Sequence, residues 1–293
     1  MPTDHSYYKQ SLDYEDILYE VDAPLARITL NRPEKMNALR NKLRGELFHA
    51  LRVAESDPEV SVIIIKGNGR CFSAGYDLGG GITPEDLPDV GPLVPGPGQW
   101  PRHLNAGYFM IWDLTKVVIA QAHGYCLAGG SELASYCDLF VVADDALIGY
   151  PPVRDMSPPD NCWFPWHLPM RKAKEMIFTG DPLTGKQAAE YGLANYSVPA
   201  DELEEFTTTL ATRVALVPPS LLALSKRQVN RTYEIMGIRN ALSAGNDIMA
   251  LNGMGGGPFV KTMQEQGLRA AIDERNARWG AYGPSPLLRP TES

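Results

Sequence analysis

The hydrophobic positions along the chain predict an alternation of buried strands and helices. Near-continuous apolar runs, rich in β-branched residues, extend over residues 60–65, 117–122 and 139–143. Such runs are typical of strands that are covered on both faces of a parallel sheet. Residues 41–55, before the first run, carry apolar positions at helical spacing, and residues 17–30 fit a β-hairpin. The pattern therefore predicts an α/β fold with largely parallel strands.

The pattern also divides the chain into two parts. Strand signals become scarce after residue 200, and helical spacing covers residues 200–216, 218–235 and 259–280. We therefore expect a strand-and-helix core over residues 14–200 and a helical C-terminal region over residues 201–285.

One segment of the core has neither period. Residues 79–105 are rich in Gly and Pro, and a loop of this length inside a compact domain usually serves function. The segment directly follows a turn at Gly75, so we expect it to cover the active site. It contains Trp100 and His103, and His103 is either a solvated side chain or an extra acid or base delivered to that site.

Composition narrows the classes of function. With 44% apolar and 21% charged residues, the chain can bury a sizeable core, and its net charge of −8 argues against nucleic-acid binding. A local group of cations could still hold a small anion or simply lie on the exposed side of a helix: Lys35, Arg40, Lys42 and Arg44. No apolar run approaches the ~20 residues of a membrane span, and the start of the chain lacks a secretory pattern. We therefore expect no membrane association and a cytoplasmic location.

The four cysteines predict neither disulfides nor a metal site. Cys71, Cys126, Cys137 and Cys162 form no CxxC pair and show no zinc-ligand spacing. We expect reduced, buried thiols.

Two glycine-containing turns carry the candidate chemistry. The turn over residues 73–78 (Ser-Ala-Gly-Tyr-Asp-Leu) follows the first apolar run, and its small residues allow a ligand to approach the backbone. The turn over residues 128–133 (Ala-Gly-Gly-Ser-Glu-Leu) follows the second run and opens a helix, whose free N–H groups favour negative charge. Tight packing of strand on helix alone would also explain Gly129 and Gly130, but the pairing of the two turns favours a functional site.

These turns, in this order, resemble the enoyl-CoA hydratase/isomerase (crotonase) superfamily. The segments Ile28-Thr29-Leu30-Asn31-Arg32-Pro33 and Met36-Asn37-Ala38-Leu39 look like its opening strand and its CoA-contacting loop. Residues 178–193 are similar to its later helical stretch, and the resemblance extends from about residue 14 to residue 280.

The resemblance implies a spiral of ββα units with a C-terminal helical region that forms trimers or pairs of trimers. It also implies an acyl-CoA substrate whose thioester oxygen lies between the N–H groups of Tyr76 and Gly129. The positions that match its substrate- and CoA-binding residues are Ala38, Ser73, Ala74, Gly75, Asp77 and Gly130. No cofactor or metal is implied, because CoA is part of the substrate.

The resemblance assigns acid–base chemistry to Glu132, although a carboxylate at a helix N-terminus is also favoured by the helix dipole alone. The second carboxylate of the hydratases is missing, because Pro152 stands in its place. Asp160 matches the Asp of members that act on dienes or aryl thioesters, but it could equally be a turn or cap residue. Asp155 competes with it, unless Asp155 pairs with Arg154.

These departures leave the reaction open. The first hypothesis is a hydratase- or isomerase-type enzyme that stabilises an enolate on a bulky acyl group. The alternatives are a hydrolase of C–C or thioester bonds and a CoA-binding protein without activity. Trp163, Phe164 and Trp166 are read mainly as packing residues, with a lining of the acyl pocket as the second interpretation.

Overall fold

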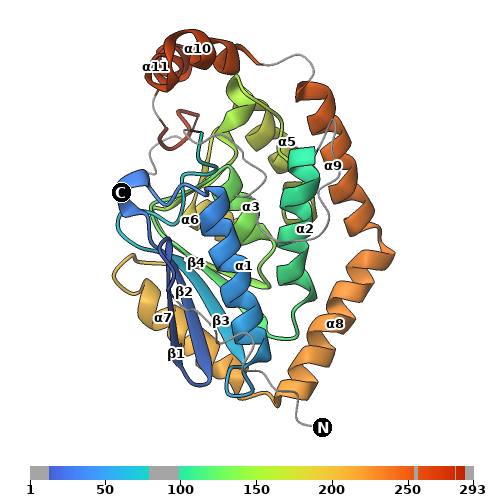
Figure 1. Ribbon diagram of the computed structural model, residues 1–293. Helices are drawn as coiled ribbons and strands as arrows, with labels where there is room; N and C mark the ends of the chain where they lie inside the picture. The colour runs from blue at the N-terminus through green and yellow to red at the C-terminus, as the bar shows by residue number, and fades with distance from the viewer. Residues whose placement is uncertain (1–12, 79–98, 254–256, 281, 288–293) are drawn as a thin grey trace.

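The structure is a computed structural model, and it describes residues 13–78, 99–253, 257–280 and 282–287. Its larger sheet has six strands in the order β1-β2-β3-β4-β6-β9 (Figure 1). The strands are β1 (Ile17–Asp22), β2 (Leu25–Leu30), β3 (Val62–Gly67), β4 (Val117–Ala122), β6 (Leu139–Ala143) and β9 (Tyr196–Val198).

The pairing of these strands confirms the predicted fold class. β1 and β2 form an antiparallel hairpin, and every pair from β2 to β9 is parallel. The three apolar runs are β3, β4 and β6, and β4 and β6 have the predicted bounds. All six residues of β4 are buried, as expected for a central strand covered on both faces.

A smaller sheet carries the chain from the large sheet toward the candidate site. β5 (Tyr125–Leu127) follows β4 after two residues and pairs in parallel with β7 (Leu147–Gly149). β7 pairs antiparallel with β8 (Leu183–Thr184). The short helix α3 (Gly129–Ser135) begins directly after β5 and is buried along its whole length.

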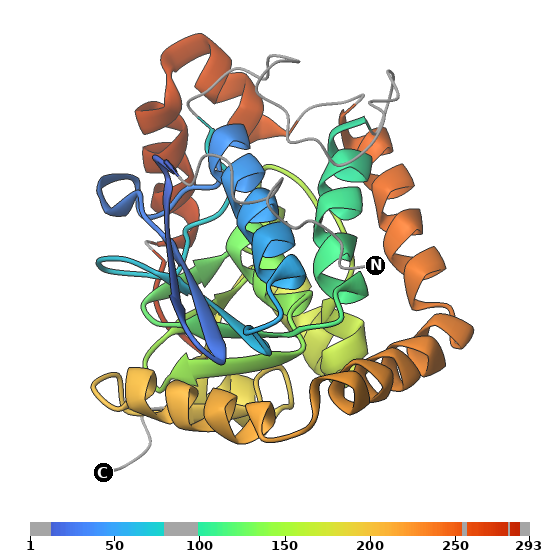
Figure 2. The ribbon, with the colours of Figure 1, turned by 60° about the horizontal axis from the view of Figure 1, so that its bottom comes forward.

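Helices cover the two faces of the large sheet. α1 (Asn41–Ser56) lies on one face and α7 (Leu203–Ala215) on the other (Figure 2). The apolar stripe predicted for residues 41–55 is buried, from Leu43 through Leu47 and Leu51 to Ala54. The remaining helices of the core are α4 (Phe164–His167), α5 (Met170–Thr179) and α6 (Gly185–Glu190).

The C-terminal region is helical, with two differences from the prediction. α8 (Pro219–Ile235) is followed by α9 (Ile238–Gly253), which was not predicted. The segment predicted as one helix is two, α10 (Pro258–Gln266) and α11 (Leu268–Trp279), because Gly267 at φ +90 breaks it. α8 and α9 run along one side of the molecule, whereas α10 and α11 lie at one end of it (Figure 1).

The predicted loop over residues 79–105 is partly wrong. Residues 79–98 lie outside the described residues, but 99–105 form the start of α2 (Gln99–Asp113). Pro101 stands in the first turn, where a missing N–H costs no helical hydrogen bond. His103 is therefore a buried helix residue and not a loop residue.

Candidate active site

The two predicted turns lie against each other. Ser73 forms a parallel bridge with Cys126 of β5: its N–H donates to the Tyr125 carbonyl at 2.9 Å, and its carbonyl accepts from Leu127 N–H at 3.0 Å. The Ser73 hydroxyl donates to the carbonyl of Asn37 at 2.9 Å. Ser73 is thus fully buried and joins the first turn to both β5 and the loop at Asn37.

In the first turn, the backbone N–H of Tyr76 points away from the neighbouring loop at Leu39. Leu39 N–H donates to Gly75 O at 2.8 Å, and Asp77 N–H donates to Leu39 O at 3.4 Å. Because extended backbone alternates its polar groups from side to side, the N–H of Tyr76 faces away from Leu39. Gly75 has φ +111, and a Cβ there would lie 2.7 Å from the Ala128 Cβ, so both conformation and space require glycine.

The second turn starts α3 with an unusual backbone conformation. Ala128 has φ 50 and ψ −125, a conformation that non-glycine residues rarely adopt and that is often found at functional sites. Gly129 follows as the first residue of α3, where an N–H has no partner within the helix. A Cβ built on Gly75 would lie 3.4 Å from Gly129 N, so the first turn lies directly against the start of α3.

Glu132 is buried one helical turn into α3, with both carboxylate oxygens bonded. The Tyr76 hydroxyl donates to Oε2 at 2.7 Å. The backbone N–H groups of Asp160 and Asn161 donate to Oε1 at 3.0 and 3.4 Å. Burial, and then the charge of Asp160, raise the pKa of Glu132 well above its ordinary value.

Asp160 lies beside Glu132 and is also buried. Burial raises its pKa to about 7, against a hydrogen bond at 3.3 Å from the Tyr150 hydroxyl and the charge of Arg44, which lower it. Two adjacent buried carboxyls do not readily ionise together, so the pair is suited to holding a proton near neutral pH.

Asp155, the competing candidate, lies elsewhere. Its expected partner Arg154 instead pairs with Asp181 at 2.7 Å, so the predicted pairing of Arg154 with Asp155 is wrong. The carbonyl of Asp155 accepts a hydrogen bond from Phe259 N–H at the start of α10. Burial raises the pKa of the Asp155 side chain, and the charge of Arg275 on α11 lowers it. Asp155 therefore faces the α10–α11 pair.

A cavity of about 860 Å³ opens between the turns and the C-terminal helices. Of the predicted site residues, it is lined by Ala74, Tyr76, Asp77 and Asp160, whereas its wall does not include Ala38, Ser73, Gly75, Gly129, Gly130 or Glu132. Pro152 and Asp155 also line it. Trp163, Phe164 and Trp166 are not on its wall, in agreement with a packing role.

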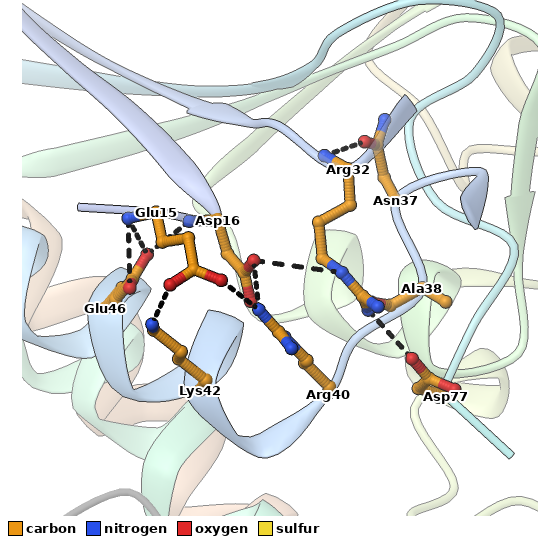
Figure 3. Close-up of polar contacts among 9 residues, drawn as sticks. All are labelled: Glu15, Asp16, Arg32, Asn37, Ala38, Arg40, Lys42, Glu46 and Asp77. Carbon is orange, nitrogen blue, oxygen red and sulfur yellow. Dashed lines mark hydrogen bonds and ion pairs between the residues drawn. The ribbon is translucent and has the colours of Figure 1, made fainter. Parts of the chain in front are cut away.

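The predicted cations at one edge of the cavity already have carboxylate partners (Figure 3). Arg40 pairs with Asp16 at 2.6 Å and with Glu15, which also pairs with Lys42. In the same view the Asp77 side chain points to the guanidinium of Arg32, 2.8 Å away. Asp77 thus lines the cavity while it fixes the loop that carries Ala38, whose carbonyl accepts from the same guanidinium at 2.6 Å.

Arg44, from the same predicted cation group, is not on an exposed face. It is fully buried, its guanidinium lies 4.7 Å from the centre of the Trp100 ring, and Nη2 donates to Asn41. Among the residues that the structure describes, its Nε and Nη1 atoms have no hydrogen-bond partner. The helical period could not show that Trp100 of α2 lies over the Arg44 side chain.

The structure corrects one prediction about the cysteines. Cys71 and Cys126 are buried, but Cys162 is exposed, which corrects the expectation of four buried thiols. Within the described ranges no group of three or more His, Cys, Asp or Glu side chains is arranged to hold a metal ion, and no helix is long and apolar enough to cross a membrane.

Comparison with known proteins decides the family. The model of the enoyl-CoA hydratase/isomerase family matches residues 20–279. The chain belongs to the enoyl-CoA hydratase/isomerase family. The crystal structure of an enoyl-CoA hydratase from Mycobacterium smegmatis is 33% identical, with a TM-score of 0.81 over 93% of this chain and 98% of that one.

Two further members of the family are similar over most of their length. An enoyl-CoA hydratase/isomerase from Xanthobacter autotrophicus is 34% identical, with a TM-score of 0.81, and the match covers 92% of this chain and 100% of that one. A hydroxycinnamoyl-CoA hydratase-lyase from Pseudomonas fluorescens is 30% identical, over 91% of this chain and 95% of the relative. The crotonase-like fold inferred from the sequence is thereby confirmed, and the protein is an enzyme of this family.

Proposed function

We propose that the protein stabilises the enolate of an acyl-CoA thioester and moves a proton at the adjacent carbons. Removing an α-proton, or adding a nucleophile at the β-carbon, puts negative charge on the thioester oxygen. The N–H groups of Tyr76 and Gly129 are the donors that would stabilise this charge, and losing one such donor typically costs roughly 3–4 kcal/mol of transition-state stabilisation. The observation that supports the proposal is that the first turn lies against the start of α3, the helix that carries Glu132, whose buried carboxyl is bonded to the backbone of Asp160.

In this proposal Glu132 is the acid–base group and Asp160 the second carboxyl. Their pKa values are raised above the ordinary carboxyl range, which suits groups that exchange protons near neutral pH. All steps use groups of the protein, and CoA enters as part of the substrate.

The acyl group in the proposal is bulky, that is, branched, cyclic or aromatic. Pro152 lines the cavity where a second Glu would hold the attacking water, and its ring has neither a donor nor an ionisable group. The volume of about 860 Å³ and the apolar side chains of the wall, such as Leu39 and Met156, leave room for such a group. Pro152 also keeps a second candidate open, a hydrolase of C–C or thioester bonds.

The proposal is tested by comparing thioesters. We expect kcat/KM for crotonyl-CoA to be low and to rise for a panel of branched, alicyclic and aromatic enoyl-CoA thioesters, with products identified by mass. A crotonyl-CoA value near the diffusional range of ~10⁸ M⁻¹s⁻¹ would contradict the importance of Pro152. Free acid and CoA as the products would favour the hydrolase, and CoA affinity without turnover would favour a binding protein.

The assembly is proposed to be a trimer or a pair of trimers. Large apolar side chains are exposed along α8 and α9, among them Leu221, Leu224, Ile248 and Leu251. Apolar surface of this extent is typical of a face that is covered by another subunit. Sedimentation that gives a stable monomer at working concentration would overturn this proposal.

A further inference from the structure

The hydroxyl of Tyr76 occupies a position between Glu132 and the cavity. Glu132 is fully buried and is not part of the cavity wall, whereas Tyr76 lines that wall. Oε2 of Glu132 accepts from the Tyr76 hydroxyl at 2.7 Å, and Oε1 accepts from two backbone N–H groups. Both oxygens of Glu132 thus accept hydrogen bonds, and of their partners Tyr76 presents its side chain on the cavity wall.

The ring of Tyr76 is also held over the second turn. A Cβ built on Gly129 would lie 2.5 to 2.7 Å from Cζ, Cε1 and Cε2 of the ring, so the ring rests on the Gly129 backbone. The Trp100 ring packs against the Tyr76 ring edge to face, with the two ring centres 5.7 Å apart. The phenol is therefore fixed beside the N–H groups that the proposed function assigns to the thioester oxygen.

We propose that the phenol of Tyr76 is a catalytic residue that exchanges protons with the substrate, with Glu132 acting through it. The inference rests on the proposed function and names the group that touches the substrate carbon. Tyr76 would then contribute twice, with its backbone N–H to the thioester oxygen and with its side chain to the proton.

The proton transfer balances without any further reactant. In the forward direction the α-carbon gives its proton to the Tyr76 oxygen while the Tyr76 hydroxyl proton passes to Oε2 of Glu132. The electron pair of the broken C–H bond enters the enolate, whose charge lies on the thioester oxygen. In the reverse direction protonated Glu132 returns its proton to Tyr76 as Tyr76 protonates the carbon.

The two transfers occur together in this scheme. Burial raises the pKa of Tyr76 well above its ordinary value, so a free phenolate does not accumulate before the substrate proton arrives. Arg44 is buried, and two of its nitrogen atoms have no hydrogen-bond partner in the described part of the chain. Its positive charge interacts with Tyr76, Tyr108 and Asp160.

The test uses α-proton exchange, which needs no knowledge of the natural acyl group. Wild-type protein is incubated in D₂O with butyryl-, cyclohexanecarbonyl- and phenylacetyl-CoA, deuterium at the α-carbon is followed by mass spectrometry, and affinity is measured by calorimetry. Tyr76→Phe keeps the ring and the backbone N–H but removes the hydroxyl. Tyr196→Phe, at an exposed position on β9 that does not line the cavity, is the matched control.

We expect Tyr76→Phe to slow exchange by about a hundredfold or more, with thioester affinity within about twofold of wild type. Tyr196→Phe should exchange at the wild-type rate. The double variant Tyr76→Phe/Glu132→Gln should be no slower than the slower single variant within about threefold, because two members of one relay are not additive.

Exchange by Tyr76→Phe within about threefold of wild type would overturn the relay and leave the proposed function standing. Independent, multiplying effects of the two substitutions would also overturn it. Wild-type protein that binds no thioester, or that binds one without exchange, would overturn the proposed function itself and the relay with it. Circular dichroism establishes that each variant is folded.

Discussion

The two walls of the cavity are built on different physical principles. The catalytic wall consists of Tyr76, Ala128 and Asp160, together with Glu132 behind them, and its polar groups are bonded to one another in a buried network. The helix-pair wall consists of Phe259, Arg275 and Tyr282 from α10, α11 and the segment after them.

Arg275 on the second wall is held by aromatic rings. Its guanidinium lies 4.3 Å from the ring centre of Tyr282 and 5.7 Å from that of Phe259, and within the described part of the chain it has no ion pair. This difference indicates which wall is suited to catalysis and which to binding an anionic ligand. A network fixed by its own hydrogen bonds is preorganised for chemistry, whereas a cation without a carboxylate partner retains its charge for an anionic ligand.

The largest effect is expected on the catalytic wall. Glu132→Gln keeps the size of the side chain but cannot carry the proton, so turnover should fall by roughly two to four orders of magnitude. Thioester affinity should be largely retained, because Glu132 lies behind the cavity surface. Steady-state kinetics and calorimetry on the same preparation check both halves of the expectation.

Asp155→Asn provides the matched control, since it removes a carboxylate from the cavity wall on the side of Arg275. We expect its turnover to stay within a few-fold of wild type. If Glu132→Gln turned over at a near-normal rate and Asp155→Asn did not, the assignment of the two walls would have to be exchanged.

The pH dependence of stability gives the second test. The pKa of Asp160 is about 7 in the folded protein against 3.8 ordinarily, so the folded state holds this proton more tightly. The resulting stabilisation is complete below about pH 4 and is lost as the pH rises through about 7. Asp160→Asn does not ionise, so relative to wild type it should gain on the order of 2–4 kcal/mol of unfolding free energy between pH 4.5 and pH 8.

Urea unfolding of both proteins at the two pH values measures this change. Asp145→Asn, at an exposed position in the turn between β6 and β7, controls for the loss of one surface charge. A constant difference between Asp160→Asn and wild type across the pH range would mean that Asp160 stays charged throughout, and the carboxyl pair would lose its role as a proton store.

Local patterns were sufficient for the central strands of the large sheet, but not for β9, which was not predicted. The continuous apolar runs are typical of buried strands, and β4 and β6 have the predicted bounds. α9 was missed because its buried positions are few and mixed, Ile238, Leu242 and Asn246, while Ile248 and Leu251 are exposed. A helix with apolar residues on both a buried and an exposed face shows no single apolar stripe in its sequence.

The contacts that define the catalytic wall were beyond local patterns. The hydrogen bond between Tyr76 and Glu132 joins residues 56 positions apart, and sequence alone gave Tyr76 only a backbone role. A tyrosine that lies directly after the small residues of the first turn was the available signal. Likewise the choice between Asp155 and Asp160 required knowing which of them folds back onto α3.

The smallest effects concern the cations that line the cavity. Arg275→Met should weaken CoA affinity by roughly tenfold with kcat unchanged, because Arg275 forms no ion pair within the described residues and Asp155 acts on its charge only from beyond ion-pair distance. Lys42→Met should change it by less than about threefold, because the Lys42 side chain is exposed and already pairs with Glu15. Calorimetric titration with CoA itself, at low and at high salt, separates the two cases, since the contribution of an exposed charge is screened by salt and that of a buried one much less. Equal losses in both variants would mean that burial and pairing do not determine which cation binds, and the helix-pair wall would then have no special role in holding CoA.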